Sequence, residues 1–406
     1  MTQPATDLPP DLVVPSYGAD SIAAVLPAVA GTLGLDLTTS TGLRSSDCQA
    51  ALGLPDARRV VVVLVDGLGL HNLTERGGHA PFLRGHLRDA AHLVTSFPST
   101  TAAALATFGT GTAPGLTGML GYTQRNPATG GLATLVSWTE QSDPYRTGQK
   151  LSGPFGVEPA DLQREATLLE QVGAAVDVVA PGRAKFAGSG MTRAALRGPR
   201  HVTAEKAADA VDATLRALRD DGLVYLYLGD VDRVGHQHGP TSWQWGDALE
   251  SLDYEIRRLA ASAPQGTLVL VTADHGMVTS EPAHQHDVAE RPELAQDVAL
   301  LGGEPRMTHV YATDGADVGA LAARWADSLG DDAVVATADR AIAAGWLGPV
   351  AEHVRPWTGD VLVAARGHAT VVDSRLHPAA ARQMPGVHGS LTATEMIVPL
   401  LVVAGR

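Results

Sequence analysis

Three apolar runs that each end in an acidic residue constrain the fold of this chain more than any other feature. The runs cover residues 59–66, 223–230 and 267–274, and they end at Asp66, Asp230 and Asp274. An unbroken series of valine and leucine is typical of a strand that is covered on both faces, as in parallel sheets. Because open α/β sheets bind ligands beyond the carboxyl ends of their strands, we expect these acids at a functional edge.

Helical patterns alternate with these strands. Residues 203–219 form an amphipathic pattern, and a second helix fits residues 243–261. Strands that alternate with helices predict a doubly wound α/β fold, with a mostly parallel sheet and helices on both of its faces. The chain has 406 residues, of which 45% are hydrophobic, so it can bury a large core.

Shorter apolar runs predict the remaining elements of the main domain. Further strands are expected at residues 91–95, 132–138, 176–180, 185–187 and 396–403, and further helices at 21–33 and 162–172. The run at residues 396–403 returns the chain to the main sheet.

Two segments differ from this pattern and set the expected domain boundaries. Residues 1–20 are rich in proline and predict an N-terminal arm. Residues 300–375 contain short predicted strands and one helix, at 318–329, and predict a small α/β cap that is inserted into the main domain. The catalytic domain is therefore expected to comprise residues 21–299 and 376–406.

The charge and cysteine content exclude several classes of partner and site. The formal net charge is −14 at pH 7, so neither a nucleic-acid polymer nor an anionic membrane is an expected partner. Cys48 is the only cysteine, which excludes an internal disulfide and a cysteine metal cluster. The first 17 residues contain no basic residue, unlike a secretory signal, so we expect a cytoplasmic protein. The oligomeric state is not predicted.

Residues 95–111 join a loop rich in hydroxyl groups to a helix of small residues that ends in glycine. Serine and threonine are favoured at a helix N-cap, because their oxygen accepts a bond from a free amide. The N-terminus of a helix also attracts anions. On the residues alone, this stretch is either a capped core helix or an anion-binding site.

Acids and histidines occur together in four separated segments, at positions expected to meet on one edge of the sheet. They are Asp66, Asp232, His236, Asp274, His275 and His388. An Asp-His pair at the end of a buried strand requires partners, because both groups have lost water. Three carboxylates and three imidazoles can bind two metal ions, and this mixture suits zinc best, with manganese or iron also possible.

Five motifs resemble those of a known family in their order and spacing. They are Val-Leu-Val-Asp-Gly at 63–67, Thr-Ala-Ala-Ala-Leu-Ala-Thr-Phe-Gly-Thr-Gly at 101–111, Asp-x-x-Gly-His at 232–236, Thr-Ala-Asp-His-Gly at 272–276 and Val-His-Gly at 387–389. Together they are similar to the nucleotide pyrophosphatase/phosphodiesterase branch of the alkaline phosphatase superfamily. The resemblance covers residues 60 to 290 and 380 to 403, approximately. It implies an alkaline phosphatase-like fold and a phosphodiesterase that uses two zinc ions.

The resemblance also implies a ligand set and a nucleophile. One implied zinc site consists of Asp232, His236 and His388, and the other consists of Asp66, Asp274, His275 and the nucleophile itself. In the family, the nucleophile stands nine residues before the threonine and ten before the glycine of a Thr-Gly pair. Here that pair is Thr110-Gly111, which selects Thr101, with Thr100 as the main rival and Ser99 and Ser96 as weaker ones. A phospho-threonine intermediate is implied, and the amide of Ala102 is expected to donate to a phosphoryl oxygen.

The chain departs from the family at the position of Tyr122, where phosphodiesterases carry asparagine, and at residues 116–118, where a His-Gly pair is usual. The hydroxyl of Tyr122 or the amide of Asn126 would then contact the phosphoryl group. Arg306 would contact substrate phosphate or fix the cap. The expected substrate is a small phosphate ester or nucleotide. The alternatives are a phosphomonoesterase, a phosphonate hydrolase or a mutase-like relative with the same bimetal site, or a non-catalytic binding protein on the same fold.

Overall fold

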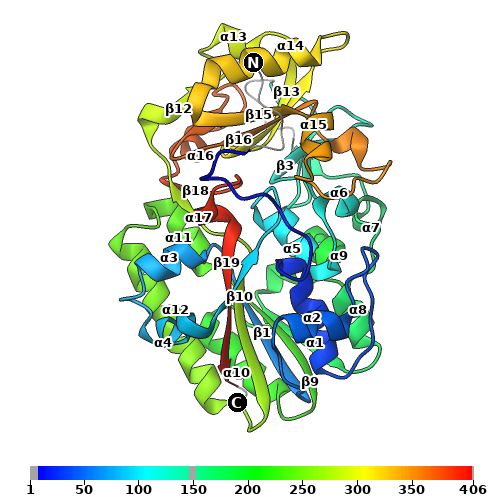
Figure 1. Cartoon of the computed structure of the whole chain (residues 1–406), viewed down its shortest axis with the longest axis vertical. Coiled ribbons are helices and arrows are strands. Elements are labelled where there is room, and N and C mark those ends of the chain that lie inside the picture. The colour runs from blue at the N-terminus through cyan, green and yellow to red at the C-terminus, as the bar shows by residue number, and fades with distance from the viewer. Residues whose placement is uncertain (1–7, 146–151, 405–406) are drawn as a thin grey trace.

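The structure is a computed structural model that describes residues 8–145 and 152–404. Figure 1 shows a large α/β body with a smaller layer of strands and helices at its upper end. Within the described ranges, no helix combines the length and the hydropathy that crossing a membrane requires.

The body is built on a seven-stranded sheet with β1 at its centre. The strand order is β2 (Ala91–Val94), β19 (Ile397–Ala404), β10 (Thr267–Ala273), β1 (Arg59–Val65), β9 (Gly222–Leu228), β7 (Asp177–Gly182) and β8 (Arg200–Thr203). β19 runs antiparallel to both of its neighbours, and all other adjacent pairs are parallel. The mostly parallel sheet that the sequence predicts is confirmed.

The three long central strands end at the same level. Val65, the last residue of β1, lies opposite Ala273 of β10 and Leu228 of β9. The six residues of β1 after Arg59 are all buried, as expected for a valine-rich strand that is covered on both faces. The acids that follow these strands therefore leave the sheet side by side.

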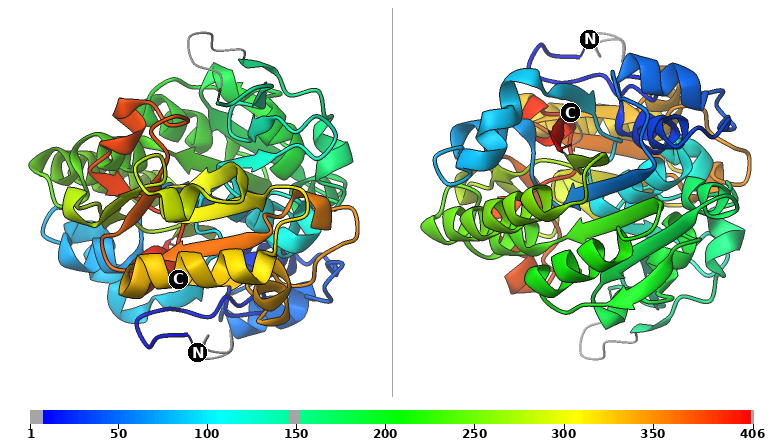
Figure 2. Two further views of the ribbon diagram at one scale, coloured as in Figure 1. Left: turned by 90° about the horizontal axis from the view of Figure 1, so that it is seen from above. Right: turned by 90° about the horizontal axis from the view of Figure 1, so that it is seen from below.

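Helices cover both faces of the central sheet, as predicted (Figures 1 and 2). One layer contains α3 (Leu70–Glu75), α4 (Pro81–His86), α10 (Ala207–Ala217), α11 (Asp230–His238) and α12 (Trp243–Ser262). The other contains α1 (Val25–Thr32), α2 (Ser45–Ala51), α5 (Thr101–Thr110), α8 (Leu168–Gly173) and α9 (Gly190–Ala195). The largest hydrophobic cluster lies between these layers and the sheet.

The cap is an eight-stranded sheet with its own helices. Its strand order is β15 (Ala333–Thr337), β16 (Val361–Ala365), β14 (Met307–Ala312), β13 (Val298–Glu304), β3 (Thr123–Arg125), β4 (Leu132–Thr134), β5 (Thr139–Gln141) and β6 (Ser152–Pro154). Its helices are α13 (Pro292–Ala295), α14 (Val318–Leu329) and α15 (Ala338–Ala343). α14 buries Leu321 and Trp325 in a separate hydrophobic cluster with Val310 and Val361, and lies on the outer side of the cap (Figure 2).

The cap sheet is wider than the predicted insertion at residues 300–375. Its strands β3 to β6 come from residues 123–154, which the sequence assigned to the catalytic domain. They join the insertion where Thr123 of β3 pairs with Gly303 of β13. Each of these four strands has only three residues, too short to produce a periodic pattern.

Three further predictions of secondary structure are corrected. Residues 185–187, predicted as a strand, form part of a 3₁₀ turn, η3 (Ala184–Phe186). The helix predicted at 162–172 is split into α7 (Pro159–Leu162) and α8, because Thr167 starts α8 with a capping box that includes Glu170. The strand predicted at 132–138 ends at Thr134, and a turn follows in which Trp138 has a positive φ of 54°.

The remaining short elements connect these layers. Two small sheets pair β11 (Val278–Thr279) with β18 (Gly386–Val387) and β12 (Gln285–Asp287) with β17 (Thr370–Val372). The short helices are α6 (Pro114–Thr117), α16 (Ala379–Arg382), α17 (Ala393–Met396), η1 (Ile22–Ala24), η2 (Leu87–Asp89), η4 (Pro282–His284), η5 (Gly330–Asp332) and η6 (Arg355–Trp357).

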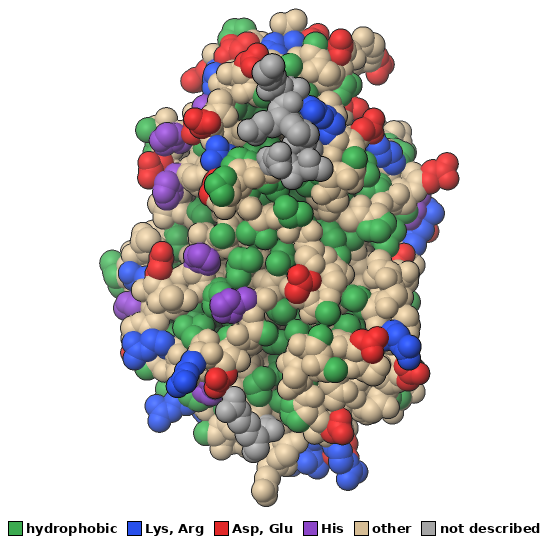
Figure 3. All heavy atoms as spheres, viewed as in Figure 1, with side chains coloured by type: hydrophobic (Ala, Val, Ile, Leu, Met, Phe, Trp, Pro, Cys, Tyr) green, Lys and Arg blue, Asp and Glu red, His purple; other side chains and the backbone are tan. Residues whose placement is uncertain are grey.

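The described part of the N-terminal arm, from residue 8, joins the body to the cap. Leu12 forms a β-bridge with Thr392 next to α17. Asp11 forms an ion pair with Arg366, which follows β16 of the cap (2.9 Å). On the face shown in Figure 3, acidic and basic side chains are intermingled rather than separated by sign.

Candidate metal centre

Two groups of three side chains lie together at the carboxyl edge of the central sheet. The Asp66 group consists of Asp66, Asp274 and His275, and the Asp232 group consists of Asp232, His236 and His388. Within each group, the potential ligand atoms lie within 4.8 Å of one another. The structure thus brings together all six residues that the sequence singled out.

The Asp66 group follows directly from the parallel strands. Asp66 comes after β1 and Asp274 comes after the neighbouring strand β10. Oδ1 of Asp274 accepts hydrogen bonds from the amides of Gly67 (3.1 Å) and His275 (3.0 Å), which fixes the carboxyl group. Nε2 of His275 lies 3.3 Å from Oδ1 of Asp66 and 3.7 Å from Oδ2 of Asp274.

The Asp232 group combines a helix with a loop from the other end of the chain. Asp232 and His236 are four residues apart on α11, so they share one face of the helix. Nε2 of His236 lies 3.4 Å from Oδ1 of Asp232. His388 follows β18, and its Nε2 lies 3.3 Å from Nε2 of His236.

All three histidines are oriented by backbone carbonyl groups. Nδ1 of His236 lies 2.8 Å from the carbonyl of Gly386, Nδ1 of His388 lies 2.9 Å from that of Ser99, and Nδ1 of His275 lies 3.0 Å from that of Gly276. A carbonyl can only accept, so in the neutral ring the proton resides on Nδ1 and Nε2 keeps its lone pair. All three lone pairs therefore belong to the nitrogens that face the acids.

Three carboxylate oxygens in these groups have no hydrogen-bond partner among the described residues. They are Oδ1 of Asp66, Oδ1 of Asp232 and Oδ2 of Asp274, and all three are buried. An unpaired buried carboxylate oxygen is costly, and each of these lies beside an imidazole lone pair. The residues present therefore fit divalent cations with mixed oxygen and nitrogen ligands, such as zinc, manganese or iron.

The ionisation of the groups is strongly coupled. Burial raises the pKa of Asp232 and of Asp274 well above the ordinary value, and repulsion from Asp66 adds to the effect. Burial alone would lower the pKa of His275, but the nearby carboxyl groups of Asp274 and Asp66 raise it to about 10. Burial lowers the pKa of His388 well below its ordinary value. These groups compete for protons at close range, a competition that bound cations would relieve.

Thr101 is the first residue of α5 and lies at the Asp66 group. Its Oγ1 is 3.3 Å from Nε2 of His275. The rival, Thr100, is the N-cap and is buried, and its side chain makes no capping hydrogen bond. The amides of the first turn, including that of Ala102, therefore receive no cap from Thr100 and remain available to an anion.

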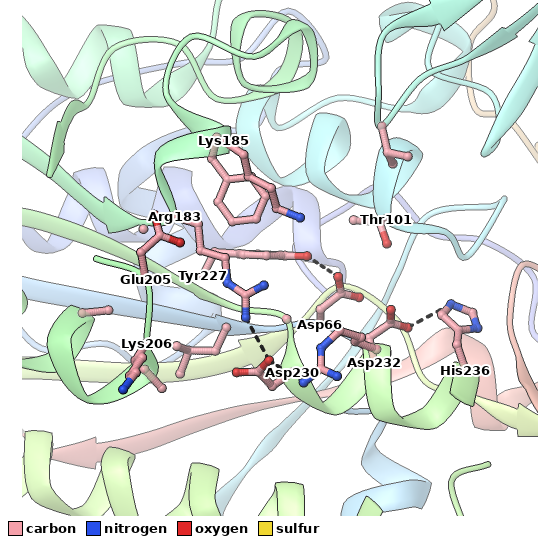
Figure 4. Close-up of a pocket in the computed structure, with 18 of the residues that line it drawn as sticks. Asp66, Thr101, Arg183, Lys185, Glu205, Lys206, Tyr227, Asp230, Asp232 and His236 are labelled. Carbon is pink, nitrogen blue, oxygen red and sulfur yellow. Dashed lines mark hydrogen bonds and ion pairs between the residues drawn. The ribbon is translucent and has the colours of Figure 1, made fainter. Parts of the chain in front are cut away.

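A cleft of about 370 Å³ opens over the two groups (Figure 4). Basic residues line the wall away from the histidines. Arg183 and Arg233 both form ion pairs with Asp230, at 3.0 and 2.9 Å, and Lys185 points into the space before Asp66 and Thr101. Of the three lysines in the sequence, Lys185 and Lys206 line this cleft. An acidic chain thus presents a basic wall to its own carboxylate centre.

The structure does not support the substrate contacts predicted for Asn126 and Arg306. Asn126 is buried, and its side chain bonds to Glu140 (3.1 Å) and to the amide of Ala128 (3.0 Å). Arg306 is fully buried, and its guanidinium forms an ion pair with Glu395 (2.8 Å). Neither lines the cleft, so both residues fix the structure instead.

Tyr122, another predicted phosphate contact, lies at the site. Tyr122 is 46% exposed and lines the cleft, as a phosphate contact would require. The amide of Tyr122 donates to Glu304 (2.7 Å), whose carboxyl pKa burial raises to about 8. His284 and His286, which belong to neither group, both contact Asp332 in the cap.

Three further residues at the cleft, Tyr227, Arg183 and Lys185, were not predicted from the sequence. The hydroxyl of Tyr227 donates to Oδ2 of Asp66 and fixes the carboxyl group. Its place near the end of β9 was an available signal, because the strand ends at the functional edge. The two basic residues follow β7, where no motif distinguished them.

Sequence comparisons relate this chain to known proteins. A sequence profile described as type I phosphodiesterase / nucleotide pyrophosphatase matches residues 60–391. The phosphopentomutase of Anaeromyxobacter dehalogenans is 28% identical over 207 residues, which are 46% of this chain and 52% of that protein. The phosphopentomutase of Shewanella denitrificans is 27% identical over 199 residues, or 44% of this chain and 47% of that protein. The chain spans about half the length of the curated relatives it matches.

Solved structures share the fold at low sequence identity. Murine ectonucleotide pyrophosphatase/phosphodiesterase 5 superposes with a TM-score of 0.63 at 14% identity, over 84% of this chain and 87% of that chain. Phosphonoacetate hydrolase from Sinorhizobium meliloti superposes with a TM-score of 0.67 at 18% identity, over 91% of this chain and 93% of that chain. The expected alkaline phosphatase-like fold is confirmed. Because the family profile covers most of the sequence, the chain belongs to the type I phosphodiesterase / nucleotide pyrophosphatase family of the alkaline phosphatase superfamily.

Proposed function

We propose that this protein is a two-metal phosphoryl-transfer hydrolase that acts on phosphodiesters, nucleotide pyrophosphates among them. The observation that carries the proposal is the arrangement of the two three-residue groups beside Thr101, with their unpaired carboxylate oxygens. The basic wall of the cleft supports an anionic substrate. The small size of the cleft favours a small phosphate ester over a nucleic-acid polymer. The cytoplasmic location stays a prediction.

The proposed metal is zinc, held by the Asp66 group with Thr101 and by the Asp232 group, with manganese or iron as alternatives. Bound cations would supply Lewis acidity, which lowers the pKa of a hydroxyl group and offsets the charge that develops on phosphate oxygens. The carbonyl groups of Gly276, Gly386 and Ser99 hold the three imidazoles in the tautomer that such ligands need.

In the proposed reaction, Thr101 loses its proton and Oγ1 attacks phosphorus. The bond between phosphorus and the leaving oxygen breaks, and a phospho-threonine forms. The amide of Ala102 at the start of α5 stabilises a non-bridging oxygen. Water then breaks the Oγ1–P bond and restores threonine. Thr101 is favoured over Thr100 because its hydroxyl lies beside His275. In agreement, a threonine-to-alanine variant of the murine relative is described as inactive.

A second candidate keeps the site but changes the substrate. Tyr122 stands where phosphodiesterases of the family carry asparagine, which weakens the argument for a diester. Relatives named phosphopentomutase and phosphonoacetate hydrolase favour a monoesterase, a phosphonate hydrolase or a mutase-like enzyme. The ratio of kcat/KM for p-nitrophenyl phosphate to that for bis(p-nitrophenyl) phosphate, at equal metal loading, separates these candidates.

The main test compares hydrolysis of bis(p-nitrophenyl) phosphate by the wild type, Thr101→Ala and Thr100→Ala. We expect loss of turnover by at least about a thousandfold in Thr101→Ala and a much smaller effect in Thr100→Ala. Undiminished turnover in Thr101→Ala would exclude this nucleophile, and activity after complete metal removal would exclude the mechanism. Elemental analysis adds a measurement without turnover: Asp66→Asn and Asp232→Asn should each lose one of the two metal ions.

A further inference from the structure

A second cavity opens beside the Asp232 group, between the body and the cap. It has a volume of about 390 Å³, and it shares with the cleft Thr100, Tyr122, His236 and His388. Strands β3, β4, β5 and β13 and helix α16 supply much of its remaining wall. We call this cavity the cap pocket. Figure 4 shows His236 on the side of the site away from Arg183, and the cap pocket begins at this histidine.

The residues that line the cap pocket identify the part of a substrate that reaches it. Two members of the Asp232 group, His236 and His388, line it, but no member of the Asp66 group does, and neither does Thr101. In an in-line reaction, the leaving oxygen departs on the side opposite the attacking oxygen. With Thr101 at the Asp66 group, that is the side of the Asp232 group. The cap pocket is therefore placed to receive the leaving group.

The cap pocket differs from the cleft in its charge. Four basic residues line the cleft, namely Arg183, Lys185, Lys206 and Arg233. Within residues 8–145 and 152–404, no lysine or arginine lines the cap pocket. A charged group beyond the leaving oxygen would lose its hydration there without gaining a cation as partner. The lining thus disfavours an anionic leaving group.

The rest of the lining suits an apolar body. Apolar side chains form a large part of the wall, among them Leu132, Leu376, Ala381, Met384 and Val387. Ligand pockets typically have volumes of about 300–1,000 Å³, and they combine apolar walls with a few polar groups that fix orientation. The cap pocket has such a volume and such walls.

Glu304 supplies a polar group of this kind. It lines the cap pocket, is only 8% exposed, and accepts the amide of Tyr122 through Oε2 (2.7 Å). Its Oε1 is buried and has no hydrogen-bond partner in the described part of the chain. The space for Oε1 exists because residue 389, next to His388, is glycine: a Cβ there would lie 2.7 Å from this oxygen.

An unpaired buried carboxyl oxygen requires a partner, and a leaving group in the cap pocket would supply it. Burial raises the pKa of the Glu304 carboxyl group to about 8. At neutral pH the group is therefore mostly uncharged, and a hydroxyl group suits it better than an ammonium group does.

We propose that the cap pocket binds the leaving group of the substrate, an uncharged alcohol with an apolar body and a second hydroxyl group for Glu304. This inference rests on the proposed function and narrows its substrate class. Phosphodiesters or phosphonate esters of such an alcohol are favoured over pyrophosphates, whose leaving group is an anionic phosphate. Glu304 is then a specificity-determining residue, and Ala381 on α16 limits the size of the alcohol.

The test keeps the retained group constant and changes the leaving alcohol. The substrates are methylphosphonate monoesters of benzyl alcohols with an ethyl, hydroxymethyl, aminomethyl or carboxyl group in the para position, which lies far from the reacting oxygen. For the zinc-loaded enzyme, we expect kcat/KM to favour hydroxymethyl over ethyl by about fivefold, from one hydrogen bond. It should favour ethyl over carboxyl by at least about tenfold. A preference for the carboxyl or the aminomethyl ester would overturn the proposal.

Variants assign these preferences to the cap pocket. Glu304→Leu should reduce the preference for hydroxymethyl over ethyl to below about twofold, whereas Glu304→Gln, whose amide can pair with a hydroxyl group, should keep most of it. A merely structural role of Glu304 would slow all esters equally and leave this ratio unchanged. Ala381→Phe, which fills the pocket, should lower kcat/KM for the ethylbenzyl ester relative to the methyl ester by at least about fivefold. The matched control is Ala380→Phe, at an exposed position of the same helix outside the pocket lining, and it should leave the ratio unchanged.

A binding measurement separates the cap pocket from the catalytic proposal. Calorimetry compares the hydroxymethyl, ethyl and carboxyl esters on zinc-loaded Thr101→Ala, with and without Ala381→Phe. Binding in the expected order that Ala381→Phe weakens would support the cap pocket even if the wild type hydrolyses none of the esters, and the proposed function alone would then fail. Hydrolysis without a preference among the leaving groups, together with equal binding, would overturn the cap pocket and leave the proposed function intact. Neither hydrolysis nor a difference in binding would overturn both.

Discussion

The buried ion pair between Arg306 and Glu395 gives the sharpest prediction about stability. Both side chains are 0% exposed, and the two charges meet at 2.8 Å. Nε of Arg306 also donates to Oε1 of Glu395 (3.1 Å), and a third bond joins Nη1 of Arg306 to the carbonyl of Ala369 (2.6 Å). Arg306 lies in the turn between β13 and β14 of the cap and Glu395 lies in α17 of the body, so the pair connects the cap to the body. Removal of one partner leaves a buried charge without compensation, which typically costs about 3–5 kcal/mol.

The predicted loss for Glu395→Ala is therefore about 3–5 kcal/mol in the free energy of unfolding. The double variant Arg306→Met/Glu395→Leu removes both charges and should recover part of this loss. Recovery stays incomplete because Oε1 of Glu395 also accepts the buried amide of Ser390 (3.1 Å), and an unpaired amide costs about 1–3 kcal/mol. The double variant should thus be more stable than Glu395→Ala by at least about 1 kcal/mol.

Urea denaturation of the metal-free protein measures these differences. The matched control is the exposed pair of Arg200 and Asp177, whose side chains are 60% and 56% exposed. Asp177→Ala should cost less than about 1 kcal/mol. A cost below 1 kcal/mol for Glu395→Ala would refute the reasoning. A large rise in KM with unchanged stability in Arg306→Met would restore the substrate contact that the sequence predicted for Arg306.

Three further predictions concern pH, packing and metal. Because Glu304 has a pKa raised from 4.5 to about 8, its stabilising effect is complete below pH 4.5 and is lost as the pH rises through 8. The expected loss is about 1.4 kcal/mol of unfolding free energy per unit of pKa shift. Glu304→Gln keeps an acceptor for the amide of Tyr122 and should make stability depend less on pH in urea titrations at pH 5 and 9. An equal pH dependence of stability in the wild type and the variant would contradict this prediction. A Cβ on Gly276 would lie 1.9 Å from the carbonyl of Thr394, so Gly276→Ala should lower stability by more than about 1 kcal/mol and weaken zinc binding measured by calorimetry. Gly85→Ala, where a Cβ meets nothing within 4 Å, is its control. Chelation should lower the midpoint of thermal unfolding, and added zinc should restore it. Free zinc at 100 times its Kd stabilises the folded state by about 2.7 kcal/mol for one site. An unchanged midpoint would argue against a metal site.

The sequence predicts the central sheet well because its strands are long and buried. The valine run of β1 admits no helical period, and the acids after β1 and β10 mark the edge where strands end together. Asp66 and Asp274 were therefore predicted to lie close together, and they do so in the structure. That these groups bind metal stays a prediction.

The sequence predicts the cap and the outer site poorly, for two physical reasons. Strands of three residues, such as β3 to β6, are held by pairing with distant strands rather than by their own pattern. The partner of Arg306 lies 89 residues away at Glu395, so no local signal distinguished an internal ion pair from a substrate contact. Lys185 and Tyr227 owe their places to the folding of β7 and β9 around the site.

The position of β19 has a consequence for the order in which the protein assembles during synthesis. This strand, at residues 397–404, separates β2 from β10, so β2 has no strand neighbour in the sheet until the ribosome has made residues more than 300 positions later. Until then the edge of β10 is open to pairing with other chains. His388 comes from the same late segment, so a nascent chain cannot complete the Asp232 group. The Asp232 group would therefore be completed only after the other strands of the central sheet, apart from β19, have been made.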